Sequence, residues 1–248
     1  MREARVVPVA ILLALTAGAA RAQTPDSLGW AWVANLGFVQ ATGNTRLTTI
    51  NAGDKLTWRP DLRWTFTRTG ALVYGKTAGV ESANQVQLGL RADYQLSPRF
   101  SAFGLVNYDR NPFAGITRRF EELAGLGVKL VATPKQVLSV DAGVGVNQQL
   151  TGGVTTSFAV ARLAPTWRYN LTSTAYVEEA VELIENLKTT GDLRSSSLSS
   201  LVAPLSSRIS LRVSYLMRYD AEPALQTAPN VYFRNLDTVF TTGIQLTL

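Results

Sequence analysis

The sequence contains neither cysteine nor histidine. Without cysteine, no disulfide holds the fold and no thiol takes part in chemistry. Without histidine, the serines lack the side chain that most often activates a nucleophile as general base. A metal site would have to be built from carboxylates alone, and no cluster of them stands out along the chain. We therefore expect no catalytic residues, no cofactor and no metal site. We do not expect the protein to be an enzyme.

A hydrophobic run long enough to cross a membrane as a helix is also missing. The longest run, Val6–Ala17, is well short of the ~20 residues that a spanning helix needs. It follows two arginines and precedes Ala20-Arg21-Ala22, which carries small residues where a signal peptidase cleaves. Residues 1–22 therefore have the organisation of a signal peptide, cleaved before Gln23, and predict export. If residues 23–248 enter a membrane, they must do so as strands.

Basic residues are in small excess over acidic residues. Cleavage would remove three of the 24 basic residues and one of the 18 acidic residues, which leaves a net charge of +4. The lysines and arginines are spread along the chain, whereas a nucleic-acid binder gathers them on one face. We therefore expect no nucleic acid as a partner.

The sequence does contain a persistent alternation of apolar and polar residues with a period of two. It is clearest in residues 83–96, 137–149 and 209–220, where for example Leu88 follows Gln87. These runs exceed the ~5–6 residues of a common soluble strand and suit the ~9–11 residues of a tilted membrane strand. The pattern predicts strands with one face toward lipid and the other toward a polar interior.

Turn signals divide the chain into about 12 such strands, an even number as in bacterial barrels. Tight connections are expected at residues 59–61, 97–99, 133–135, 170–172 and 204–206. Other connections are expected at residues 42–44, 77–82, 111–116, 151–153, 188–192 and 221–231. An even count puts both termini on one side, which the tight turns indicate to be the periplasm. The expected fold is all-β, an antiparallel up-and-down transmembrane β-barrel over residues 23–248.

Aromatic residues fall near the ends of the expected strands. The five tryptophans are Trp30, Trp32, Trp58, Trp64 and Trp167, beside the tight turns or at the start of the first strand. Tyr108 and Phe120 belong to a second group toward the opposite ends. Two aromatic girdles are typical of a membrane barrel.

The end of the chain also resembles the signal by which outer-membrane barrels are recognised for assembly. Gly243, Leu246 and Leu248 carry this resemblance, with leucine in the terminal position where phenylalanine is more usual. It implies the barrel assembly machinery and outer-membrane lipid as partners.

The alternation assigns a group of charged residues to the lumen. They are Arg91, Asp93, Lys129, Asp141, Glu178, Glu182, Arg212 and Arg218. They would either line a channel for a small solute or ion, or form an internal salt-bridge network that fills a narrow barrel. Acids and bases are balanced in this group, so it indicates no preference for anionic solutes. Glycines such as Gly125 and Gly143 also fall on the lumen face, where they leave room for a bulky neighbour or open a pore.

Two carboxylates do not fit this assignment. Counting from neighbouring apolar residues places Asp54 and Glu179 on the lipid face, where a carboxylate is disfavoured. A β-bulge that shifts the register, or a position near the membrane interface, would account for them.

Two stretches carry a family resemblance. The first is Leu36-Gly37-Phe38 leading into Thr42-Gly43-Asn44-Thr45. The second runs from Tyr94-Gln95-Leu96-Ser97-Pro98-Arg99-Phe100 through Asn107-Tyr108-Asp109-Arg110 to Gly125-Leu126-Gly127. They resemble the salt-induced outer-membrane protein family, a family of uncharacterised barrels. The resemblance implies a bacterial outer-membrane location and a link to salt stress, and it supplies no catalytic residue.

The leading hypothesis is a porin-like barrel that acts as a small passive channel or as an envelope structural protein linked to salt or osmotic stress. One alternative is a closed barrel that binds a ligand or partner through its outer loops. The other is a soluble periplasmic binder of the lipocalin type.

Overall fold

The computed structural model describes residues 28–41, 47–224 and 232–247, and nearly all of them lie in strands. The strands are β1 (Gly29–Ala41), β2 (Leu47–Arg59), β3 (Trp64–Thr77), β4 (Val80–Gln95), β5 (Phe100–Asn111), β6 (Ile116–Ala132), β7 (Gln136–Thr151), β8 (Val154–Asn170), β9 (Tyr176–Asn186), β10 (Leu193–Pro204), β11 (Ile209–Asp220) and β12 (Leu236–Thr247). A 3₁₀ turn, η1 (Pro112–Ala114), joins β5 to β6. The predicted signal peptide, residues 1–22, lies outside the described residues.

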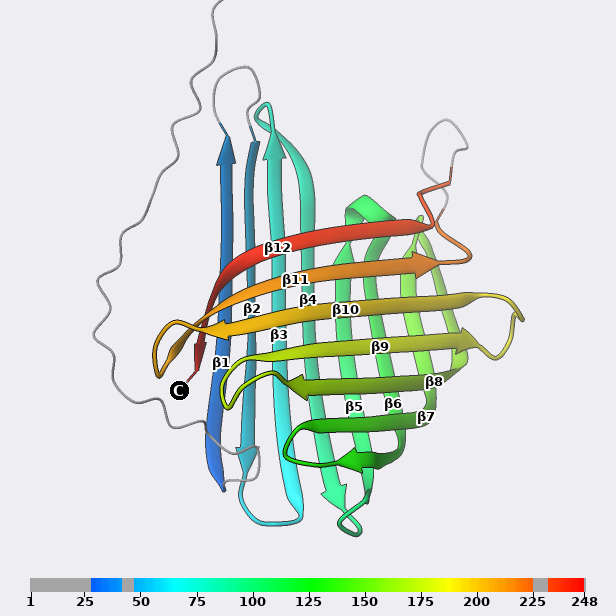
Figure 1. Ribbon diagram of the computed structural model, residues 1–248. Helices are drawn as coiled ribbons and strands as arrows, with labels where there is room; N and C mark the ends of the chain where they lie inside the picture. The colour runs from blue at the N-terminus through cyan, green and yellow to red at the C-terminus, as the bar shows by residue number, and fades with distance from the viewer. Residues whose placement is uncertain (1–27, 42–46, 225–231, 248) are drawn as a thin grey trace, which may run out of the picture.

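Every strand pairs antiparallel with its neighbours in the chain, and β12 returns to pair with β1. The sheet is thereby a closed 12-strand barrel, which confirms the expected fold. In Figure 1, β9 to β12 cross steeply in front of β1 to β4, because the strands of a closed barrel tilt and coil around its axis. The described residues include no helix with the length and hydrophobicity that crossing a membrane requires.

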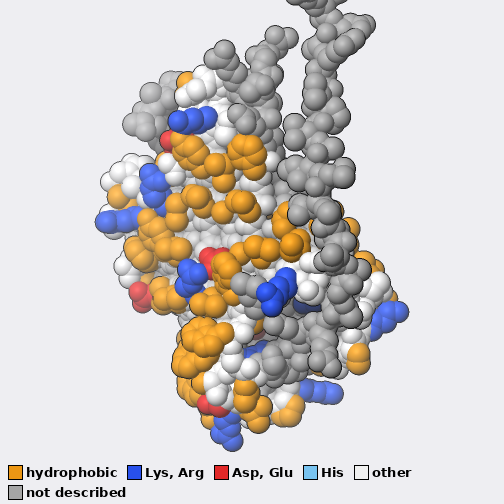
Figure 2. Space-filling model, turned by 90° about the vertical axis from the view of Figure 1, so that its left-hand side faces the viewer, with side chains coloured by type: hydrophobic (Ala, Val, Ile, Leu, Met, Phe, Trp, Pro, Cys, Tyr) orange, Lys and Arg blue, Asp and Glu red, His pale blue; other side chains and the backbone are white. Residues whose placement is uncertain are grey.

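The two faces of the sheet have the predicted polarity. Leu88 and Val144 point outward and are 51% and 62% exposed, whereas Gln85 and Asn147 point inward and are buried. Cross-strand partners share a face, so the register carries this assignment from strand to strand around the barrel. Figure 2 shows hydrophobic side chains spread over much of one outer face, with basic and some acidic side chains between and around them.

An aromatic row marks the end of the barrel near residue 30. Trp58 stacks on Trp30 and on Phe66 with ring centroids 5.3 Å apart in each case, and Trp64 stacks on Phe66 at 5.6 Å. Tyr94 extends the row across β1 to β4. At the other end, Tyr108 packs on Phe120 with centroids 5.0 Å apart. Aromatic groups thus lie at both rims, as the sequence predicts.

The connection between β2 and β3 lies at the tryptophan rim, the end of the barrel that carries Trp30, Trp58 and Trp64. There the Asp61 carboxylate accepts hydrogen bonds from the backbone N–H groups of Trp64 and Arg63, at 2.8 and 2.7 Å. These bonds hold the pKa of the exposed Asp61 below its usual range. They fix the connection between β2 and β3 as an Asx-type turn.

At the opposite rim, the connection expected at residues 77–82 is shorter than predicted, and the connection expected at residues 151–153 is present at Gly152-Gly153. Both are two-residue hairpins, formed by Ala78-Gly79 and Gly152-Gly153 with positive φ at each residue. Such turns match the twist of paired strands and let β4 begin at Val80. The periplasmic assignment of the tryptophan rim therefore cannot rest on turn length and remains a prediction.

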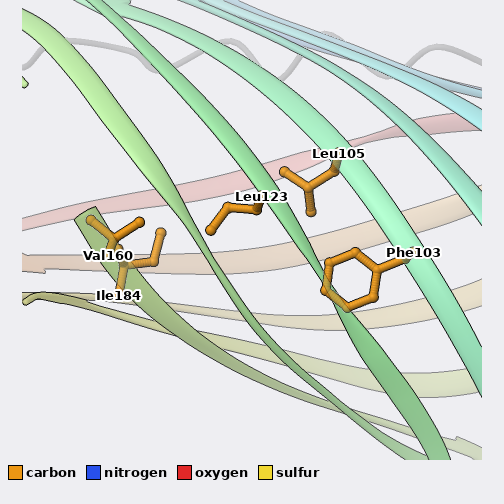
Figure 3. Packing of buried hydrophobic residues seen from close by; sticks show 5 residues of the cluster. All are labelled: Phe103, Leu105, Leu123, Val160 and Ile184. Atoms are coloured by element: carbon orange, nitrogen blue, oxygen red, sulfur yellow. The ribbon is translucent and has the colours of Figure 1, made fainter. Parts of the chain in front are cut away.

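Part of the barrel interior is filled by apolar side chains. Phe103 and Leu105 from β5, Leu123 from β6, Val160 from β8 and Ile184 from β9 form a buried cluster (Figure 3). Gly125 and Gly143 lie against the ring of Phe103. A Cβ atom at Gly125 would fall 2.8 Å from the ring and 2.1 Å from the backbone oxygen of Ala142. These glycines therefore leave room for a bulky neighbour, the Phe103 ring, which is the first of the two interpretations given for the lumen glycines.

Replacing Gly125 by alanine should destabilise the barrel by about 1–3 kcal/mol, because the added methyl group overpacks the cluster. Urea unfolding in lipid vesicles would measure this loss. Gly104→Ala is the matched control, since a Cβ atom there meets nothing within 4 Å. Equal stability of the two variants would contradict the packing described here.

Candidate functional site

The lumen contains two chambers. The loop-end chamber has a volume of about 290 Å³ and lies toward the connection between β11 and β12, where Pro223 and Phe233 line it. The central chamber has a volume of about 470 Å³ and lies between β1–β4 and β8–β12. Both chambers are lined by Gln85, Gln87, Glu182, Ser196 and Arg218. The two chambers therefore meet at the level of these residues.

One hydrogen bond crosses the lumen at this level. The Arg218 Nη2 atom on β11 donates to the Gln87 Oε1 atom on β4 over 2.6 Å. Strands β11 and β4 are not neighbours in the sheet, so the bond spans the interior instead of running along the wall. Arg218 and Gln87 are therefore joined across the lumen at the level where the two chambers meet.

Three of the sequence-predicted residues form a single cluster on the wall beside the apolar side chains. Arg91 forms salt bridges with Asp93 and Asp141, each at 2.6 Å. Its guanidinium lies 4.3 Å from the centre of the Phe103 ring. Arg162 adjoins this cluster through Asp141, at 3.9 Å, and pairs with Glu182 at 2.5 Å. This side of the lumen is a filled salt-bridge network.

Arg212 has a looser environment than this cluster. It donates hydrogen bonds to Ser200, Ser214 and Gln245 at 2.8, 3.1 and 3.1 Å, and the Glu178 carboxylate lies 4.0 Å away. Arg218 makes no salt bridge with any of the described residues. Lys129 lies apart from both chambers, exposed near the end of β6 beside a register shift.

The sequence analysis missed a buried pair that spans the lumen. Arg194 on β10 contacts Glu121 on β6 at 2.7 Å, and their side chains are only 14% and 9% exposed. Arg194 also donates to the Asn147 side chain at 3.3 Å. The adjacent acids Glu121 and Glu122 were the available signal, because neighbours in a strand point to opposite faces and one of the two must point inward.

Charged residues on the outer face have local partners. Asp54 pairs with Arg68 and accepts a hydrogen bond from Trp32 Nε1 at 3.4 Å. Glu179 accepts hydrogen bonds from Ser197 and Ser199 at 2.6 and 2.5 Å. The register runs without a shift at both positions, so a bulge is the wrong explanation for them. Neighbouring polar groups satisfy these carboxylates instead.

Comparison with known proteins places the sequence in a family. Residues 34–245 match the family described as "Protein of unknown function, DUF481". The chain belongs to this family. A comparison with curated proteins gives no match.

Solved structures show the fold of this DUF481 chain. A structure of the NanC porin superposes with a TM-score of 0.56 at 11% identity, covering 88% of this chain and 100% of that one. The translocator domain of the autotransporter NalP from Neisseria meningitidis gives a TM-score of 0.49 at 11% identity, with 90% of this chain and 89% of that one covered. The DUF481 chain thus shares the closed β-barrel fold of the NanC porin.

The DUF481 barrel places two residues of the predicted assembly signal at its seam. Gly243 faces the interior, where an added Cβ atom would lie 2.4 Å from the backbone oxygen of Leu36. Leu246 faces outward and is 40% exposed. Leu248 lies outside the described residues. Among those residues, no group of three or more acidic side chains could hold a metal ion.

Removing either partner of the Glu121–Arg194 pair should destabilise the DUF481 barrel by about 3 kcal/mol, because the remaining charge is buried without its partner. A double-mutant cycle with Glu121→Gln and Arg194→Gln, followed by urea unfolding, should give a coupling energy of about 1–3 kcal/mol. The loosely spaced pair Glu178 and Arg212 is the control and should couple more weakly. Strictly additive effects at Glu121 and Arg194 would contradict a direct interaction.

Proposed function

We propose that this protein is a narrow, passive and non-catalytic channel of the bacterial outer membrane for small hydrophilic solutes or ions. The observation that carries the proposal is a pair of chambers inside a closed barrel, each lined by charged and amide side chains as well as apolar ones, in contact with each other at one level. The apolar outer face and the aromatic groups at both rims support the membrane location. The fold shared with a porin is consistent with a channel.

The interior explains why the channel would be narrow. The apolar cluster around Phe103 and the Arg91 network fill one side of the lumen, which leaves the chambers displaced toward the other side. At their junction, the cross-lumen contact described is a single hydrogen bond between two long side chains. Rotation of Arg218 or Gln87 would open the junction without breaking any strand pairing.

A closed barrel with a structural role in the envelope is the second candidate. The bond between Arg218 and Gln87 favours it, because in this conformation the bond spans the lumen at the level where the chambers meet. The link to salt or osmotic stress that the family resemblance implies would suit either role.

The outer-membrane location predicts that the protein stays in the pellet when membranes are extracted with carbonate, and that it fractionates with outer membranes on a density gradient. An apolar outer face held in lipid is the reason for this expectation. Release into the soluble fraction would instead support a periplasmic binder.

Gln87→Ala should raise the single-channel conductance in planar bilayers roughly 1.5- to 2-fold, because it widens the junction without changing the charge. Gln148→Ala removes the same side chain from an exposed position on the outer face and should leave conductance unchanged. Discrete conductance in neither the native protein nor Gln87→Ala would remove the channel proposal and leave the closed barrel.

A further inference from the structure

Charge is unevenly divided between the two chambers. The charged residues that line the central chamber are Arg162, Glu182, Arg212 and Arg218, which is three bases against one acid. The charged residues of the loop-end chamber are Asp109, Arg119, Glu121, Glu182, Arg194, Arg218, Arg234, Asp220 and Asp237, with more acids than bases. The lumen charges are therefore balanced only when both chambers are taken together. The central chamber is basic, and the loop-end chamber is slightly acidic.

Two of the bases in the central chamber are poorly neutralised. Within the part of the chain that the structure describes, the side-chain hydrogen bond of Arg218 goes to an uncharged amide, that of Gln87. Arg212 bonds to uncharged oxygen atoms, and its nearest carboxylate, Glu178, is at the 4.0 Å limit of a salt bridge. Guanidinium groups in this state favour an anion, since they never lose their charge and match a carboxylate with two parallel N–H bonds.

The third base offers an unused donor. Arg162 is paired through Nε with Glu182 at 2.5 Å, but its Nη1 atom is buried without a hydrogen-bond partner. The side chain is nine-tenths buried, at 10% exposure. A buried donor without an acceptor costs free energy. The Nη1 atom has almost no exposed surface, so an acceptor oxygen in the chamber would recover this cost only if the Arg162 side chain moved. Asp141 lies 3.9 Å from this atom, too far for a hydrogen bond.

The opposite wall of the chamber is polar and uncharged. Asn35 on β1 and Asn51 on β2 line it, and the Oδ1 atom of Asn51 is buried without a hydrogen-bond partner. That oxygen has almost no exposed surface, but a molecule that presents a carboxylate to the arginines would have the side chains of Asn35 and Asn51 on its other side. This combination fits a small carboxylate with hydroxyl or amide groups better than a simple halide ion.

Arg212 and Arg218 lie six residues apart on the inner face of β11. At about 3.3 Å per residue, their backbones are roughly 20 Å apart. One small molecule would therefore contact them in succession. Successive weak positions favour passage, because each holds an ion without trapping it.

We propose that the central chamber binds small organic anions bearing a carboxylate, with Arg218 at its junction and Arg212 farther along as successive binding positions. This inference names a ligand class for the proposed channel. It rests on the channel proposal only for the passage of the anion through the barrel. Binding in the chamber requires access from one end alone.

The first test measures the reversal potential of the full-length protein in a planar bilayer under a potassium chloride gradient. We expect anion selectivity in the native protein. Arg212→Gln and Arg218→Gln should each lower the chloride-to-potassium permeability ratio roughly tenfold. One unit charge acts about threefold on an ion about 6 Å away in water, and it acts in opposite directions on chloride and on potassium. Glu182→Gln, which removes the one acid of the chamber, should raise the ratio. Arg68→Gln, which removes a positive charge from the outer face, should leave it unchanged.

The second test does not require conduction. Succinate should raise the melting temperature of the folded barrel in detergent, because a ligand that binds only the folded state stabilises it. Succinamide, which has the same shape without charge, should not. The stabilisation should be reduced in Arg212→Gln and in Arg218→Gln, lost when both are replaced, and kept in Arg68→Gln, with folding of each variant verified by its heat-modifiable mobility on gels.

The outcomes separate this inference from the channel proposal. Stabilisation by succinate without conductance would remove the channel and retain the anion site. Conductance that favours potassium, or a permeability ratio unaffected by Arg212→Gln and Arg218→Gln, together with no stabilisation by succinate, would overturn the anion site and retain the channel.

Discussion

Hydrogen bonding between β1 and β12 is the interaction on which the rest of the structure depends. In lipid, each unpaired backbone group costs several kcal/mol, so a sheet can span a membrane only if it closes on itself. Among the described residues the seam is short, with register pairs from Val33 with Thr247 to Leu36 with Ile244. Gly243 permits the close approach of the two strands there, because any side chain would strike the Leu36 carbonyl. Every other strand has its position fixed by this closure.

A closed barrel of this size also encloses an interior that side chains must fill or water must enter. The chain fills one side with the apolar cluster around Phe103 and with ion pairs that reach between strands distant in the sequence. Buried ion pairs contribute little net stability, but removing one partner is costly. The network therefore acts as a constraint on shape. It leaves the central chamber between β1–β4 and β8–β12, where both amide and apolar side chains line it.

The alternation in the sequence predicts the faces of most strands, because each side-chain position has only two choices of direction. It is uninformative on β5, where Phe103 and Leu105 point inward between Gly104 and Val106, so that neither face is polar. The apolar cluster could not be found for this reason. The pairing of Arg194 with Glu121, and that of Arg218 with Gln87, depend on how far the lumen narrows, which no local pattern encodes. The charge of the candidate site was thus visible in the sequence, but its division between two chambers was not.

The tryptophans have a consequence for how this protein can be observed. Trp30, Trp58 and Trp64 belong to one stacked aromatic row on a single rim of the barrel, and Trp32 lies two residues from that row on the outward face of β1. Intrinsic fluorescence is therefore a local reporter of this chain. Its emission follows the transfer of one rim from water to the headgroup region, while the opposite rim, with its tyrosine and phenylalanine rings, contributes little signal.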